Sequence, residues 1–291
     1  LKAGSLKLSK AMTQTSDASD VANNIGSYIG STVTNYTPNG GDKNVGWKIF
    51  YAGKSDAGDS SEADHIYLIA DDCIDIKNSA GEYNTPVSAN GNQVDIFNDA
   101  PKCAAFMSIK NGGSGYSREN SLAKNWIAKD YAINYMIERW SNLYGSKYAE
   151  YAIASPPVEM YIKSWNSNPQ YEKLSYDSYY YDYSYAKGWA MTINGHVSQP
   201  IEFINTTAGY NDTLYFPSVA EGVRNSCYGY WLIDQSINAS LAPCNWTVVS
   251  ITKEGERQLL LGAPGANTLG IRPIVCLNTN VRLQIDGMDS D

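Results

Sequence analysis

Apolar and polar residues follow strand-like patterns over most of this chain, and the clearest helical periodicity lies in its middle third. Residues 45–52 and 65–70 are runs rich in β-branched and aromatic side chains, so each run predicts a strand. Between residues 122 and 144, apolar side chains recur at spacings of three and four, which predicts a helix that ends at Gly145 in a left-handed conformation. A second helix is expected after Pro156 and Pro157.

Strand patterns dominate the remainder of the chain. Asn194-Gly195 separates two apolar runs and predicts a hairpin, and residues 246–252 and 257–261 flank a polar turn as a second hairpin. Residues 271–277 and 281–285 are two closing strands. Strands at both ends with helices between them indicate one α+β domain with mixed or antiparallel sheets and two or more packed helices. We expect strand 47–52 to lie beside strand 281–285.

The first thirty residues differ from the rest. Leu6, Leu8 and Met12 give a weakly amphipathic pattern, which predicts a helical stalk or the end of a trimmed anchor over residues 1–30, followed by a binding domain over residues 31–291. The chain begins at Leu1 with a helix-like pattern. We therefore expect an N-terminal segment absent from this chain to anchor the protein at a cell surface.

Composition and charge narrow the classes of partner. The chain carries 22 Lys and Arg against 30 Asp and Glu, a formal net charge of −8, with no basic run. Nucleic acid is therefore an unsuitable partner, and without a basic amphipathic helix or a long apolar stretch we expect no direct membrane insertion. Charged residues make up only 18% of the chain, whereas Tyr, Asn, Ser and Gly are abundant, a composition typical of binding loops.

The five cysteines form no metal or redox motif. They are spread without any C-x-x-C pair, so a zinc site is not predicted. Cys276 lies in an apolar run and is interpreted as a small core residue. Cys227 and Cys244 are a candidate disulfide that the sequence leaves open.

Enzyme and cofactor signatures are absent from the sequence. It contains two histidines, His65 and His196, and no serine-hydrolase, metalloprotease, Walker or Rossmann motif, so we expect a protein that is not an enzyme and has no cofactor. Two clusters of acidic residues are interpreted as solvated loops, with a structural calcium site as the alternative. Their members are Asp56, Asp59, Glu62 and Asp64, and Asp71, Asp72 and Asp75. Five Asn-x-Ser/Thr sequons, at Asn35, Asn205, Asn211, Asn238 and Asn245, are interpreted as chance products of an Asn-rich surface.

Two motifs carry a resemblance to a known family. Residues 230–232 read Y-W-L, and residues 270–277 read G-I-R-P-I-V-C-L. This ending resembles a bacterial family of secreted or prepilin-anchored proteins of unknown function, which is similar to C-type-lectin-like and formylglycine-generating-enzyme-like folds and to the variable proteins of diversity-generating retroelements. Residues 47–51, 66–72 and 151–160 extend the resemblance. The chain departs from the family's Gly-Gly-Pro-Thr turn at residues 154–157, and from its usual Y-W-L continuation at Asp234.

The resemblance implies a C-type-lectin-like fold whose ligand surface lies between the two motifs. Trp231, Arg272 and Pro273 then serve the scaffold, and we expect Arg272 to be buried and hydrogen-bonded. The ligand-binding candidates in that interval are Asp234, Gln235, Asn238, Asn245, Trp246, Gln258 and Asn267. A related oxidase activity is a remote alternative, because the flanks of the cysteines do not resemble the formylglycine-generating site.

A tyrosine-rich tract over residues 179–185 completes the predicted binding face. Five tyrosines within seven residues are hard to bury together, so Tyr179, Tyr181 and Tyr183 are expected to contact a ligand. The sequence therefore predicts an extracellular or surface-displayed adhesion module that binds a protein or glycan on another cell or surface. Self-assembly into a pilus-like filament through the same tract is the rival hypothesis.

Overall fold

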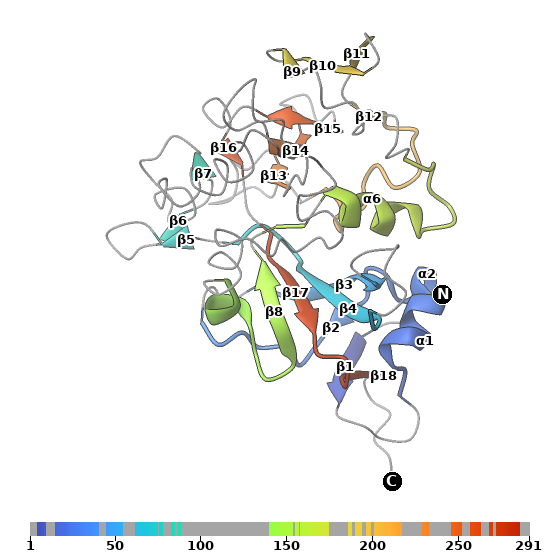
Figure 1. Cartoon of the computed structure of the whole chain (residues 1–291), viewed down its shortest axis with the longest axis vertical. Helices are drawn as coiled ribbons and strands as arrows, with labels where there is room; N and C mark the ends of the chain where they lie inside the picture. Colours follow the sequence, from blue (N-terminus) through green and yellow to red (C-terminus); the bar gives the residue numbers. More distant parts are fainter. Residues whose placement is uncertain are drawn as a thin grey trace.

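The computed structural model describes residues 5–9, 15–40, 45–54, 62–74, 76–77, 83–84, 87–88, 140–153, 155–156, 158–174, 186–187, 190–193, 196–198, 201–216, 229–232, 246–251, 257–262, 268–269 and 272–285. Within these residues the protein has an α+β architecture built on a seven-stranded, mostly antiparallel sheet (Figure 1). The order of its strands is β18-β1-β2-β3-β4-β17-β8. They comprise β1 (Ser5–Ser9), β2 (Thr32–Val33), β3 (Trp47–Gly53), β4 (His65–Ala70), β8 (Ala149–Ile153), β17 (Ile274–Leu277) and β18 (Arg282–Ile285).

Both faces of this sheet are covered, which explains why β17 is apolar throughout and β4 is apolar after His65. Every residue of β4 is buried, and neighbouring side chains enter different cores. Ile66 and Leu68 belong to one core, whereas Tyr67 and Ile69 belong to the other. Such continuous apolar runs are typical of strands buried on two sides, while alternating runs mark half-exposed strands.

Helix α1 (Ala18–Asn23) covers the first face. Asp17 caps this helix, since its side chain accepts a hydrogen bond from Asp20 N, while the Asp20 side chain accepts one from Asp17 N. Val21 then packs into the first core. The helical residues 140–144 contribute Trp140 and Tyr144 to the same core. Helix α2 (Ile25–Tyr28) follows α1 directly.

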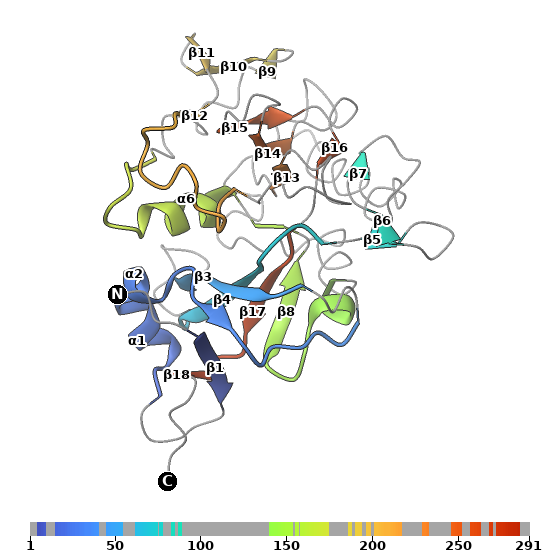
Figure 2. The ribbon, with the colours of Figure 1, turned by 180° about the vertical axis from the view of Figure 1, so that it is seen from behind.

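Helix α6 (Val158–Asn166) covers the second face, between the large sheet and a second group of strands (Figure 1, Figure 2). A β-bulge in β3 helps to seat it. The register shifts between Ile49 and Tyr51, and the carbonyl of Phe50 accepts a hydrogen bond of 2.7 Å from Ser164 Oγ of α6. The bulge therefore provides an acceptor through which the helix is joined to the sheet.

A four-stranded antiparallel sheet of order β12-β15-β14-β13 adds to the second core. It supplies Phe203, Tyr230 and Leu259 to that core. Its strands are β12 (Ile201–Phe203), β13 (Gly229–Trp231), β14 (Trp246–Ile251) and β15 (Arg257–Gly262). Shorter strands complete the described fold: β5 (Ile76–Lys77) pairs β6 (Tyr83–Asn84), β7 (Val87–Ser88) pairs β16 (Thr268–Leu269), and β10 (Ala190–Ile193) pairs β9 (Ala186–Lys187) and β11 (His196–Ser198).

A buried guanidinium, that of Arg272, joins the large sheet to the segment before β13. Arg272 is fully buried and donates hydrogen bonds from Nε and Nη2 to the Ala70 carbonyl at 3.1 and 2.9 Å, and from Nη1 to the Leu214 carbonyl at 2.8 Å. Its carbon Cζ also lies 4.9 Å from the centre of the Tyr230 ring. The expectation that Arg272 is buried and hydrogen-bonded is confirmed, and Pro273 beside it is also buried.

The N-terminal prediction was wrong in one respect. Residues 5–9 form strand β1, not a helix, and Leu6 and Leu8 are buried in the first core. The side chain of Asn35 holds this strand, accepting from Leu8 N at 2.7 Å and donating to Leu8 O at 2.9 Å. Alternating Leu-x-Leu spacing fits a strand better than a helix. A helix does follow, but only from Ala18.

Two further expectations need correction. Strand β3 does not lie beside β18, because β1 and β2 stand between them in the same sheet. The sequence-based pairing omitted these two strands.

Gly145 does end a helical turn, its N–H donating to Ser141 O at 2.8 Å, but its φ is not left-handed. Glycine is needed there because a Cβ would lie 2.3 Å from the Ser141 carbonyl oxygen.

Several other predictions are confirmed. Strands β3 and β4, helix α6 after the proline pair, the hairpins β10–β11 and β14–β15, and the closing strands β17 and β18 all occur near their predicted positions. Strand β17 starts at Ile274 and not at residue 271 as predicted, and Arg272 and Pro273 lie before it. Among the described residues, none of the helices combines the length and the apolar character that a membrane span requires.

Replacing Arg272 by Ala should lower the free energy of unfolding by roughly 3–5 kcal/mol, because buried carbonyls lose their donors. Urea unfolding measures this. The control is Arg282→Ala: Arg282 is half-buried in β18 and donates only to Thr279 and Val281 carbonyls nearby, so its loss should cost about 1 kcal/mol or less. Equal effects of the two substitutions would contradict the central role of Arg272.

Candidate functional site

A polar concavity of about 470 Å³ opens where the segment after β12 meets the segment after α6. It is shallow and open to solvent, unlike an enclosed, mostly apolar small-molecule pocket. Amide, hydroxyl, carboxylate and phenol groups surround it. The lining residues are Tyr171, Asn205, Thr207, Gly209, Tyr210, Asn211, Asp212 and Thr213.

The segment 204–216 forms this concavity because it is a succession of tight turns between two apolar anchors. Thr207 N donates to Ile204 O at 2.8 Å, Tyr210 N to Thr207 O at 3.0 Å, and Asp212 N to Gly209 O at 2.9 Å. Residues such as Gly, Asn, Asp and Thr favour such turns. Buried Phe203 and Leu214 hold the two ends of the segment in the second core.

Asp212 organises the end of the segment through both carboxylate oxygens. Oδ1 accepts a hydrogen bond from Leu214 N at 2.9 Å, and Oδ2 accepts one from the hydroxyl of Tyr171. Burial raises the pKa of Tyr171, and the hydrogen bond with Asp212 and the negative charge of its carboxylate raise it further. The phenol therefore stays protonated, and it remains a hydrogen-bond donor to Asp212.

Gly209 allows the ring of Tyr171 to lie against the turn. Gly209 has φ +89°, and a Cβ at this position would lie 2.6 Å from Tyr171 Cζ and 3.0 Å from the Trp165 ring. The rings of Tyr171 and Trp165 lie 4.6 Å apart, centre to centre. Because Trp165 is fully buried in the second core, one wall of the concavity rests on a rigid foundation.

Arg257 stands against the other aromatic side chain of the concavity. Its guanidinium carbon lies 4.2 Å from the centre of the Tyr210 ring, in cation–π geometry. Strand β15 places it there, since Arg257 pairs with Phe203 of β12 at the start of the turn segment. The negative charge of Asp212 therefore belongs to the lining of the concavity, and the positive charge of Arg257 lies beside one of its lining residues.

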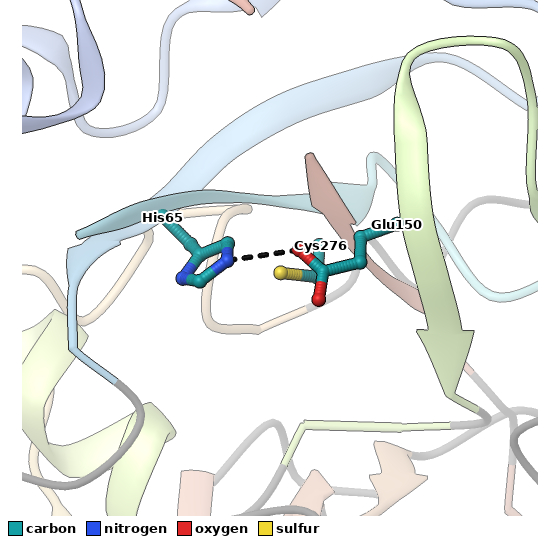
Figure 3. Close-up of side chains that lie close together, drawn as sticks. All are labelled: His65, Glu150 and Cys276. Atoms are coloured by element: carbon teal, nitrogen blue, oxygen red, sulfur yellow. Dashed lines mark hydrogen bonds and ion pairs between the residues drawn. The ribbon is translucent and has the colours of Figure 1, made fainter. Parts of the chain in front are cut away.

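A second cluster brings together side chains from three adjacent strands of the large sheet (Figure 3). His65 of β4 and Glu150 of β8 share a hydrogen bond of 2.9 Å between Nε2 and Oε2, and the sulfur of Cys276 in β17 lies nearby. Burial raises the pKa of the Cys276 thiol far above its usual range. A protonated, buried thiol is neither a nucleophile nor a ready metal ligand, so we assign no metal or catalytic role to this cluster.

Most of the predicted ligand-binding residues lie outside the described residues. These are Tyr179, Tyr181, Tyr183, Asp234, Gln235, Asn238, Asn245 and Asn267. Cys227 and Cys244 lie outside them as well. Trp246 and Gln258 occur in one hairpin at different positions of its ladder, since Trp246 pairs with Gly262 whereas Gln258 pairs with Ser250. Trp231 lies in β13, where its backbone alone is described.

The predicted calcium ligands are only partly described. Asp71 Oδ1 accepts from Gly46 N at 3.0 Å, and Asp72 Oδ1 accepts from Cys73 N at 2.7 Å. Asp71 therefore joins the end of β4 to the segment before β3, and Asp72 serves the turn that follows β4. Asp75 and residues 55–61, including Asp56 and Asp59, lie outside the described residues.

The concavity itself was not predicted from the sequence. Its signal was available in the two sequons at Asn205 and Asn211, which lie six residues apart in a turn-rich stretch between apolar anchors. Both asparagines are exposed, unlike Asn35, whose amide is bound to β1. Tyr171 carried no comparable signal, because only the folded chain brings it beside Asp212.

Comparison of the chain with models of protein families, with curated proteins and with solved structures finds no match in any of the three.

Substituting Gly209 by Ala should destabilise the fold by about 2 kcal/mol or more, through the left-handed φ and the collision with the Tyr171 ring. Gly40→Ala is the matched control. A Cβ at Gly40 meets its nearest atom at 3.5 Å and requires no positive φ, so the change should stay within about 0.5 kcal/mol. Denaturant unfolding compares the two variants, and a fully stable Gly209→Ala variant would show that the wall is not built on this contact.

Proposed function

We propose that this protein is an extracellular ligand-binding module that recognises a protein or glycan on another cell or surface through the concavity at residues 171 and 205–213. The observation that carries the proposal is the construction of that concavity. Exposed amides such as Asn205 and Asn211 stand on a wall whose aromatic side chain, Tyr171, rests on the buried Trp165. Specific binding requires such polar groups in fixed positions.

A C-type-lectin-like fold is part of this proposal. Two features support it: strands from both ends of the described chain, β1 and β18, pair in one sheet, and the motif residues Tyr230, Arg272 and Pro273 are buried. Such a fold leaves turn segments free to vary on a constant scaffold. The turn segment 204–216 is of this type, because its ends are fixed in the core while its middle lines the concavity.

The tyrosine tract and the interval between the two motifs extend the proposed binding surface. Tyr179, Tyr181 and Tyr183 precede β9, and Asp234 and Gln235 follow β13. Strands β12 and β13 belong to the same four-stranded sheet, and β12 leads directly into the turn segment. Tyrosine and short amide side chains are typical of such contact surfaces.

A binding role is favoured over covalent catalysis by the described residues. The thiol of Cys276 has a strongly raised pKa because of its burial, and both carboxylate oxygens of Asp212 accept hydrogen bonds within the protein, from Leu214 N and the Tyr171 hydroxyl. Neither group is therefore prepared as a nucleophile or a general base. A filament subunit is distinguishable from an adhesion module by the experiment below.

Flow cytometry with the fluorescently labelled chain on fixed epithelial and bacterial cells tests the proposal. We expect staining of at least one cell type, and about a tenfold weaker signal for Asn211→Ala and Asn205→Ala, because both exposed amides line the concavity. Asn142→Ala is the matched control, since Asn142 is exposed on the helical turn 140–144, whose buried residues join the first core.

Staining that survives both substitutions, or no staining of any cell type, would contradict the proposal. Analytical ultracentrifugation of the same variants separates the filament hypothesis. Loss of self-association in Asn205→Ala or Asn211→Ala, with unchanged cell staining, would identify the concavity as a contact between subunits.

A further inference from the structure

We infer that the ligand of the concavity is an uncharged, polyhydroxylated molecule, such as an oligosaccharide of neutral sugars, and that it is bound without a bridging metal ion. This inference rests on the proposed function and specifies its ligand. Three properties of the concavity carry it: the balance of charge, the engagement of its carboxylate, and the short amides and hydroxyls of its lining.

The charges at the site oppose each other. Asp212 is the carboxylate among the described lining residues, and the guanidinium of Arg257 lies against the ring of Tyr210, another lining residue. With one charge of each sign close to the site, neither an anionic ligand, such as a sialylated, sulfated or phosphorylated glycan, nor a cationic ligand gains a net electrostatic attraction. An uncharged ligand does not depend on such attraction.

The carboxylate of Asp212 is already committed to the protein. Leu214 N occupies Oδ1 at 2.9 Å, and the Tyr171 hydroxyl donates to Oδ2. A calcium ion requires six to eight oxygen ligands, usually including several carboxylates, whereas the described lining supplies one. The remaining lone pairs of Asp212 can still accept hydrogen bonds from ligand hydroxyl groups.

The other lining groups match a polyol. Asn205 and Asn211 each offer donors and an acceptor, and Thr207 and Thr213 offer hydroxyls that can do both. The Tyr171 hydroxyl donates to Asp212 and its ring lies against Gly209 and Trp165, so this residue shapes the wall of the concavity.

A protein ligand would require a different surface. Stable protein interfaces bury about 1,200–2,000 Å² around desolvated aromatic or apolar anchors. Here Ile204, which is 60% exposed, is the large apolar side chain that stands out among the described residues, and it lies next to the polar Asn205. One such side chain does not make an apolar patch.

An array of immobilised oligosaccharides tests the inference, with neutral, sialylated and sulfated glycans probed in calcium-containing buffer and in EDTA. We expect binding confined to neutral glycans and unchanged by EDTA. Asn211→Ala and Asn205→Ala should each weaken it about tenfold, while Asn142→Ala leaves it unchanged. Comparison of melting temperatures confirms that all three variants are folded.

The outcomes separate failure of this inference from failure of the proposed function. Binding only to sialylated or sulfated glycans, or binding that EDTA abolishes, would overturn the inferred ligand class. If that binding is still weakened by Asn211→Ala, the concavity remains the binding site. The absence of glycan binding, together with cell staining that still depends on Asn211, would likewise overturn the inference and indicate a protein ligand. Glycan binding that is unchanged in both Asn205→Ala and Asn211→Ala would overturn the inference and the proposed site together.

Discussion

The hydrogen bonds of the buried Arg272 guanidinium are the interactions on which the rest of this structure depends. A buried positive charge without partners is strongly unfavourable, so the chain must bring acceptors to it. It does so with backbone carbonyls that are distant in sequence, those of Ala70 at the end of β4 and Leu214 in the turn segment. The constraint therefore fixes β4, β17 and the segment 204–216 relative to one another, with Tyr230 of β13 beside the guanidinium.

The same constraint leads from the scaffold to the candidate site. Leu214, whose carbonyl accepts from Arg272, also donates its N–H to Asp212. Asp212 in turn accepts from Tyr171, whose ring packs on Trp165. A continuous set of contacts thus joins the large sheet to the wall of the concavity. Preorganised groups of this kind bind with less loss of conformational entropy than mobile ones, which favours recognition of a small ligand.

The sequence predicted the parts of the fold whose signals are local. Strand β4 is a continuous apolar run, and the β14–β15 hairpin has a polar turn between two apolar segments. The N-terminal strand was missed because two apolar residues, Leu6 and Leu8, are too few to define a period. In addition, β1 is stabilised by partners far along the chain, Ile285 and Asn35 among them. Pairing of this kind leaves no periodic signal within five residues.

The site was less predictable than the fold for a related reason. Arg272 could be recognised because a motif resemblance surrounds it, and its burial followed as expected. The concavity instead requires Tyr171 and Asp212 to meet across 41 positions, which neither composition nor spacing indicates. The predicted candidates of the tyrosine tract and of residues 234–245 lie outside the described residues and stay predictions.

Hydrogen–deuterium exchange of an Arg272→Lys variant tests most directly whether this guanidinium holds the turn segment 204–216 on the sheet. A lysine keeps the charge but cannot present a planar fork to two separate carbonyls. We predict that the amides of Asp212, Tyr215 and Phe216, which are hydrogen-bonded within the turn segment, exchange faster by at least about tenfold, while those of α1 change little. Unchanged exchange in the turn segment, or an equal increase in α1, would contradict the claim that Arg272 couples the scaffold to the site.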